Sequence, residues 1–177
     1  MTVEIRRLRA EDLDRVCAAL TSRPPQVHRR RLDAQTRGGF VYLIGWVDGE
    51  PAGFVGVGLH EDASPDVVAE SRGYAMVSDL LVEEPFRRRG LARALMLALE
   101  EEARAAGMPG VILDTGTDDT FAVSRALYRS LGYRDQGGVY LGGWSDPDQP
   151  GVHYVDPLTL WLKPLAPRRI GSGIRSP

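Results

Sequence analysis

The segment Arg87-Arg88-Arg89-Gly90-Leu91-Ala92 has the composition of a turn that binds phosphate groups. A helix N-terminus presents free N–H groups and the positive end of the helix dipole, so an anion is stabilised there. Small residues such as Gly90 and Ala92 let a pyrophosphate approach the backbone, and the arginines add positive charge. Taken alone, the segment could equally be a solvated loop in which Gly90 is a turn residue. The elements on either side must decide between these two interpretations.

A predicted strand precedes this segment and a predicted helix follows it. Residues 74–82 end in the apolar triplet Leu80-Leu81-Val82, which is typical of a buried strand. From Leu91 onward, apolar residues recur on one helical face, and Gly107 supplies a stop. A phosphate-binding turn requires this strand–turn–helix context.

The other elements are predicted from the period of the apolar residues and from turn residues. We expect a loop at 61–73, strands at 3–8, 40–47, 52–60, 111–115, 133–144 and 153–162, and helices at 13–20, 24–32 and 123–131. A largely antiparallel first half followed by a strand–helix–strand–helix unit predicts an α+β (mixed α/β) domain on one twisted sheet.

Chain length and composition limit the class of protein. The 177 residues, 43% of them hydrophobic, suffice for one domain and are too few for two. We assign residues 1–164 to that domain and 165–177 to a flexible tail. Cys17, the single cysteine, excludes an intrachain disulfide and is interpreted as a core residue. No apolar run approaches the roughly 20 residues of a membrane span, so we expect a cytoplasmic protein that does not bind membranes.

The charge balance argues against a nucleic-acid-binding protein. The chain has 22 basic and 24 acidic side chains, a net charge of −2, whereas nucleic-acid binding requires a basic surplus. The short runs Arg29-Arg30-Arg31 and Arg168-Arg169 are interpreted as solvated faces. We expect no metal ion, and the sequence leaves a homodimer open.

Two motifs together resemble the Gcn5-related N-acetyltransferase (GNAT) superfamily. Its first signature is Arg or Gln, two residues, Gly, one residue, then Gly or Ala, and Arg87, Gly90 and Ala92 match it. Its second is Leu-Tyr, three residues, Gly, then Phe or Tyr, which 127–133 match. The resemblance covers roughly Val3 to Pro164, including the order of the elements. It implies a GNAT-like fold whose central strand splays from its neighbour to bind acyl-CoA.

The resemblance also implies which residues contact the coenzyme, here acetyl-CoA acting as co-substrate. Backbone groups of the splayed strand would bind the pantetheine arm and the thioester oxygen, and the turn would anchor the phosphates. The expected contact residues are Leu80, Leu81, Val82, Arg87, Arg88, Arg89, Gly90, Leu91, Ala92, Arg93, Phe121 and Ser124. Phe121 is a departure, because family members often carry an asparagine seven residues before the motif tyrosine.

Tyr128 is the candidate general acid. The thiolate that leaves during acyl transfer needs a proton, and a tyrosine with a pKa near 10 stays protonated at neutral pH. Alternatively, Tyr128 only packs its ring on the sheet with its hydroxyl at the rim.

Asp79 is the candidate general base, since an acceptor ammonium must lose a proton before it can attack. Strict alternation places Asp79 on the face of Val77 and Leu81, so only a bulge would turn it to the other face. Glu83 and His60 are weaker candidates, interpreted as ordinary solvated residues.

The acceptor is an amine of a small molecule or a protein. Two acidic loops could attract a cationic amine, although we interpret them first as solvated loops. They contain Glu61, Asp62, Asp66 and Glu70, and Asp146, Asp148 and Asp156. A non-catalytic coenzyme sensor and a transferase of a longer acyl group remain alternative functions.

Overall fold

Eight strands and four α-helices form the part of the chain that the computed structural model describes, namely residues 1–59, 73–145 and 153–166. The strands are β1 (Val3–Arg7), β2 (Phe40–Val47), β3 (Glu50–Gly58), β4 (Ala75–Val82), β5 (Gly110–Gly116), β6 (Arg134–Asp135), β7 (Tyr140–Ser145) and β8 (His153–Pro164). The α-helices are α1 (Leu13–Ala19), α2 (Pro25–Arg37), α3 (Leu91–Ala105) and α4 (Ala122–Ser130).

The strands form one mixed sheet in the order β1-β2-β3-β4-β5-β8-β6, and β7 also pairs with β8. Every pairing is antiparallel except that of β4 with β5, which is parallel. The helix α3 connects these two strands, as a parallel pair requires a crossover. The mixed α+β architecture predicted from the sequence is confirmed.

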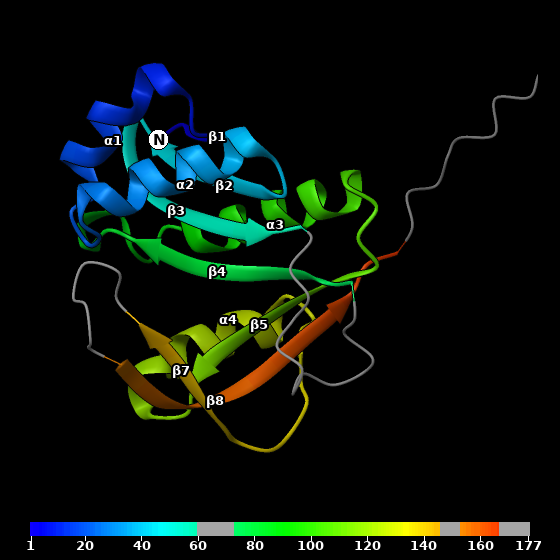
Figure 1. Ribbon diagram of the computed structural model, residues 1–177. Coiled ribbons are helices and arrows are strands. Elements are labelled where there is room, and N and C mark those ends of the chain that lie inside the picture. The colour runs from blue at the N-terminus through cyan, green and yellow to red at the C-terminus, as the bar shows by residue number, and fades with distance from the viewer. Residues whose placement is uncertain (60–72, 146–152, 167–177) are drawn as a thin grey trace, which may run out of the picture.

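The sheet opens between β4 and β5. Only Ala75 with Val111 and Met76 with Ile112 are in register, and beyond them the two strands diverge (Figure 1). Each strand keeps its other neighbour, since β4 stays paired with β3 to Val82 and β5 with β8 to Gly116. The divergence therefore leaves one backbone edge of each strand unpaired, while both strands keep the pairing on their other edge.

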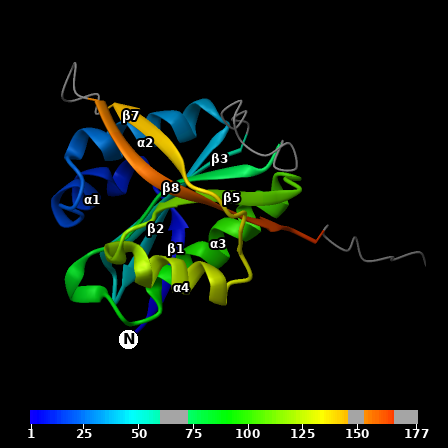
Figure 2. The same cartoon turned by 90° about the horizontal axis from the view of Figure 1, so that it is seen from below.

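Helices cover both faces of the sheet (Figure 2). The larger core cluster lies under α3 and includes Leu95, Leu99, Leu113, Tyr128 and Trp161. A second cluster lies under α1 and α2, where Val16 and Leu20 meet Tyr42, Ile44 and Phe54. None of the described helices is both long and apolar enough to cross a membrane.

Two sequence expectations require correction. The predicted strand over 133–144 is interrupted, because Gly137 and Gly138 adopt left-handed φ angles of 69° and 78° that end β6 before β7 begins. Leu165, which we assigned to the tail, is 7% exposed, packs in the larger core, and donates its N–H to the carbonyl of Pro109 at 2.9 Å. Residues 167–177 of the tail lie outside the described residues.

A buried ion pair joins α3 to β8 and so ties the two halves of the opened sheet. Lys163 Nζ lies 2.8 and 2.7 Å from the two carboxylate oxygens of Glu100, whose side chain is 1% exposed. Arg104 adds a longer contact of 3.5 Å to the same carboxylate. The ion pair adds to the hydrophobic core that joins the two halves, since only two residue pairs join β4 and β5 directly.

We expect Lys163→Met to lower the free energy of unfolding by about 3 kcal/mol, because it leaves a buried carboxylate without its main partner. The double variant Glu100→Gln/Lys163→Met should recover much of this loss, since the amide carries no charge. Urea denaturation of the two variants measures both quantities. Equal stability of Lys163→Met and the wild type would show that the ion pair does not clamp the halves.

Candidate active site

The chain between β4 and α3 forms a turn with two left-handed residues. Arg88 has a φ of 63°, and Gly90, the residue before the first turn of α3, has a φ of 82°. Glycine suits the second position because it adopts this region without strain. No side chain caps the first turn of α3, so its backbone N–H groups remain available to an anion. The turn therefore has the backbone geometry expected of a phosphate site.

The arginines of the turn do not all point toward open solvent. Arg87, Arg88 and Arg89 are exposed, but the Nε of Arg87 donates to the carbonyl of Val82 at 2.9 Å and fixes the exit from β4. The Nη2 of Arg93 donates to the Oγ of Ser130 at 2.8 Å, which ties α3 to α4. Arg88 and Arg89 thus supply exposed positive charge at the turn.

The unpaired edge of β4 leads directly into this turn. Leu80 and Val82 pack on the core under α3, and Leu81 packs on the core under α1 and α2. Their side chains therefore stabilise the strand, and their backbone groups on the β5 side are not used in the sheet. A linear polar ligand can bind along such an edge as an added strand would.

Tyr128 lies on α4 and belongs to the core cluster that contains residues of β4 and β5. Its side chain is 7% exposed, and its ring packs against the rings of Tyr133 and Trp161 at centroid distances of 6.0 and 6.4 Å. Burial, followed by the negative charges of Asp114 and Asp79, raises the pKa of Tyr128 to about 12. The phenol is therefore protonated at neutral pH and lies near two carboxylates on the opposite face of the sheet.

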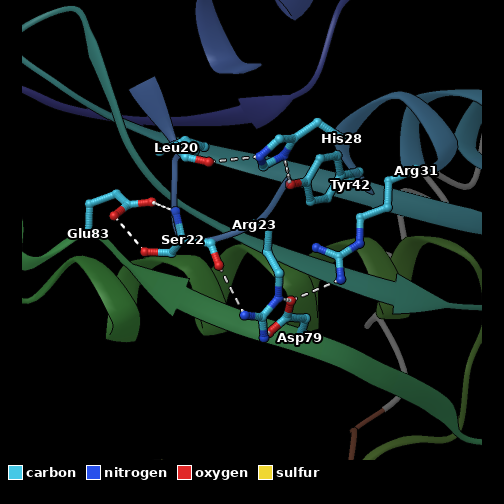
Figure 3. Close-up of polar contacts among 8 residues, drawn as sticks. All are labelled: Leu20, Ser22, Arg23, His28, Arg31, Tyr42, Asp79 and Glu83. Atoms are coloured by element: carbon cyan, nitrogen blue, oxygen red, sulfur yellow. Dashed lines mark hydrogen bonds and ion pairs between the residues drawn. The ribbon is translucent and has the colours of Figure 1, made fainter. Parts of the chain in front are cut away.

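A bulge in β4 turns Asp79 toward α2. Asp79 pairs with Gly56 and Val77 pairs with Val57, so Ser78 is the extra residue that reverses the alternation. The Asp79 carboxylate accepts hydrogen bonds from Arg23 at 3.0 and 3.3 Å and from Arg31 at 2.9 Å (Figure 3). Asp79 thus faces the α1 and α2 side of the opening, and both of its oxygens are already engaged.

Arg31 is consequently not part of a solvated face, as the run Arg29-Arg30-Arg31 had suggested. Its side chain is only 16% exposed, and its guanidinium lies 5.2 Å from the ring centroid of Tyr42 and 5.3 Å from that of Phe54. Helical spacing places one arginine of the run inward, where the carboxylate of Asp79 compensates its charge.

The loop between α1 and α2 is held from two sides (Figure 3). Glu83, which we interpreted as solvated, accepts hydrogen bonds from the backbone N–H and hydroxyl of Ser22 at 3.0 and 2.6 Å. His28 is fully buried and donates from Nε2 to the carbonyl of Leu20 at 2.9 Å, while its Nδ1 accepts from the Tyr42 hydroxyl at 2.7 Å. Burial lowers the pKa of His28, which keeps this neutral arrangement. The loop is thus fixed beside the opening.

Phe121 and Ser124 lie near the N-terminus of α4, next to the end of β5. Phe121 is 41% exposed, and its ring lies against Gly116 so closely that a Cβ there would be 2.4 Å from it. Ser124 is half-buried. Their predicted coenzyme contacts stay predictions. His60 and the acidic residues at 61, 62, 66, 70, 146 and 148 lie outside the described residues.

The motif residues and the fold agree with one protein family. A sequence model of the acetyltransferase (GNAT) family matches residues 4–133, from β1 to the end of the second motif. The chain belongs to the GNAT family. In this GNAT protein the matched region contains the turn, the opened strands and Tyr128.

Relatives of this GNAT protein include an "IAA acetyltransferase" of Azospirillum brasilense, 34% identical over 94 residues, which are 52% of this chain and 53% of that protein. Human "N-acetyltransferase 8" is 39% identical over 66 residues, or 37% of this chain and 28% of that protein. The chain therefore spans about half, or less, of the length of these relatives. A Salmonella typhimurium acetyltransferase structure with its cofactor acetyl-CoA has a TM-score of 0.68 and 18% identity, covering 94% of this chain and 95% of that one. At this identity, the likeness supports the fold alone.

Asp114 is a carboxylate beside the opening that the sequence patterns did not single out. It lies in β5, two residues beyond the last pair with β4, and accepts a hydrogen bond from the Tyr140 hydroxyl at 3.0 Å. The signal available in the sequence is a carboxylate that directly follows the apolar strand residues Val111-Ile112-Leu113. Acidic residues in such strands are rare unless paired, so the pattern marks Asp114 as a candidate functional residue.

Proposed function

We propose that this protein transfers the acetyl group of acetyl-CoA to an amine of a small molecule or a protein. The observation that carries this proposal is the continuous path from the β4–β5 opening to the uncapped N-terminus of α3. The path is a line of unused backbone groups that ends at an anion-binding turn. Coenzyme A has the same order of parts, a linear pantetheine arm followed by a pyrophosphate.

The turn would bind the phosphates chiefly through backbone groups. The first N–H groups of α3, at Leu91, Ala92 and Arg93, have no intrahelical acceptor, and the helix dipole favours an anion there. Arg88 and Arg89 would add charge-assisted hydrogen bonds of about 1.5–3 kcal/mol each. A substrate that lacks phosphates would lose all of these contacts.

The opened edge of β4 would hold the pantetheine arm and the thioester. Backbone N–H groups of residues such as Leu80 and Val82 are candidates to donate to the oxygen on which negative charge develops during attack. In other enzymes, loss of one such donor costs about 3–4 kcal/mol of transition-state stabilisation. Because these donors are main-chain groups, they would survive most side-chain substitutions.

Tyr128 would supply the proton to the leaving sulfur. Its hydroxyl enters the opening from the α4 side, where a pantetheine arm on β4 would end in its thioester. A thiolate formed in this buried opening is itself poorly solvated, which raises its affinity for a proton and helps a phenol of high pKa to donate.

Asp79 as general base stays a prediction. Two guanidinium groups already occupy its oxygens, and these contacts support a role in fixing Arg23 and Arg31 beside the acceptor. A homodimer and a cytoplasmic location also stay predictions. The names of the relatives include both small-molecule and general N-acetyltransferases, so they leave the acceptor open.

Thiol release from acetyl-CoA tests the proposal. The purified protein would be incubated with acetyl-CoA and a panel of polyamines, aminoglycosides, amino acids and peptides, and free coenzyme A would be followed with a thiol reagent. We expect acceptor-dependent release with at least one class of amine. Saturable binding of acetyl-CoA without turnover on any acceptor would contradict an enzyme and favour a coenzyme sensor. Longer acyl-CoA donors in the same assay test acyl-chain preference.

A further inference from the structure

Asp114 lies on the face of the sheet opposite to α3. Val111 and Leu113 point into the core under α3, whereas Ile112 points to the opposite face, so alternation places Asp114 on the side of α1 and α2. Asp79 lies on the same side of the sheet, but on β4. The two carboxylates therefore flank the opening from its two strands, and Tyr128 enters from the other face.

The environments of the two carboxylates differ. Asp79 is paired with two arginines, whereas the described residues provide Asp114 with no cation, one side-chain hydrogen bond, from Tyr140 to its Oδ2, and a contact with its own backbone. The partner of Asp114 on β8 is Leu160, which is apolar and 6% exposed. Asp114 is thus a half-buried carboxylate whose second oxygen, Oδ1, has no side-chain donor among the described residues.

We propose that Asp114, in place of Asp79, is the general base that takes a proton from the acceptor ammonium, and that Tyr140 positions its carboxylate. This inference rests on the proposed acetyl transfer, because it assigns a residue to one step of that reaction. It also assigns a role to β7, which pairs with β8 and carries the Tyr140 hydroxyl to Asp114.

The proton balance of the reaction is complete with these two side chains. The acceptor ammonium gives one proton to Asp114 Oδ1, and the resulting amine forms the N–C bond. The C–S bond breaks with its electron pair on sulfur, and the sulfur takes the Tyr128 proton. The nitrogen returns its second proton to Tyr128, and Asp114 releases its proton to solvent. The products are an amide, a thiol and one proton.

The proton on Asp114 would also help Tyr128. The charge of Asp114 is the larger of the two carboxylate contributions that raise the pKa of Tyr128. Once Asp114 is protonated, this contribution disappears, so the phenol becomes a stronger acid when the sulfur needs its proton. Deprotonation of the amine and protonation of the sulfur are therefore coupled through one carboxylate.

Burial gives Asp114 the proton affinity that a base requires. Desolvation raises the pKa of Asp114, and the hydrogen bond from Tyr140 opposes that rise. Tyr140 of β7 is the titratable group that contacts Asp114 directly, and Tyr128 of α4 is a second one within reach of its charge. Asp79 of β4 acts on the same phenol. Since the base must be ionised, kcat/KM should fall as the pH drops through the pKa of Asp114.

The test compares Asp114→Asn with Asp79→Asn in the thiol-release assay across pH. We expect Asp114→Asn to lower kcat/KM about 100-fold at neutral pH, with the loss shrinking near pH 10 where the acceptor amine ionises by itself. Acetyl-CoA affinity and Tm should stay near wild type. Asp79→Asn should keep the fall of kcat/KM at low pH (the acid limb of the pH profile). An acid limb that is lost in Asp79→Asn and kept in Asp114→Asn would overturn the assignment.

Tyr140→Phe provides a second, milder test that does not require the Asp114 variant to fold. Loss of its hydrogen bond to the ionised carboxylate should raise the pKa of Asp114 and move the acid limb of kcat/KM to higher pH, with little change on the plateau. If Tyr140→Phe leaves the low-pH fall of kcat/KM at the same pH, and Asp114→Asn turns over like the wild type, the assignment of Asp114 is overturned. The proposed acetyl transfer would then still stand. Absence of turnover in the wild type on every acceptor would instead overturn the proposed function.

Discussion

Replacement of Tyr128 by phenylalanine is expected to lower turnover about 100-fold at neutral pH and to leave the affinity for acetyl-CoA nearly unchanged. Phenylalanine keeps the ring that packs against Tyr133 and Trp161, so only the proton donor is removed. Steady-state thiol release measures kcat, and calorimetric titration measures acetyl-CoA binding.

Tyr133→Phe is the matched control for this variant. Tyr133 is also buried, its ring is 6.0 Å from that of Tyr128, and its hydroxyl lies beside the carboxylate of Glu100 on α3. Removal of that hydroxyl should leave turnover close to wild type. Equal turnover in Tyr128→Phe and Tyr133→Phe would remove Tyr128 from the mechanism and leave it as a packing residue.

Gly90→Val is expected to weaken acetyl-CoA binding at least 10-fold. Valine at a φ of 82° is strained by about 2 kcal/mol, and relief of that strain would turn the first N–H groups of α3 away from the phosphates. Loss of one charge-assisted hydrogen bond alone would cost about 1.5–3 kcal/mol. Titration with acetyl-CoA measures the change.

The same helix offers a control for strain at its other end. Gly107 follows α3 with a φ of 77°, and a Cβ there, as at Gly90, would meet no atom within 4 Å. Gly107→Val should therefore lower Tm by about as much as Gly90→Val does, and it should leave acetyl-CoA affinity unchanged. If both variants lose affinity for acetyl-CoA equally, the loss comes from a general destabilisation of α3 and not from a change in the phosphate-binding turn.

The donor half of the site could be predicted from the sequence because its signals are local. The arginines, Gly90 and the apolar period of α3 lie within one stretch of chain, and helix termini bind anions in many contexts. Strands and helices were also predicted where period and turn residues agreed, as at β2, β3 and α3. The glycine pair at 137–138 shows the limit, since a strand pattern continued across residues whose φ angles end the strand.

The acceptor half could not be predicted because it depends on contacts between distant segments. The face of Asp79 was decided by a bulge at Ser78, which strict alternation does not show. The inward position of Arg31 follows from its contact with Asp79, 48 residues away, and Tyr140 reaches Asp114 across 26 residues. Side-chain type alone identified none of these pairs.

The central claim is that the β4–α3 turn binds the coenzyme through its phosphates, and one comparison of affinities tests it most directly. Acetyl-CoA and S-acetylpantetheine share the thioester and the arm, but the second lacks every phosphate. We expect calorimetric titration to give acetyl-CoA an affinity at least 100-fold higher, about 2.7 kcal/mol, which is the contribution of one or two charge-assisted hydrogen bonds. Equal affinities would contradict the claim, and residues Arg87 to Ala92 would then be a solvated turn that does not bind the phosphates.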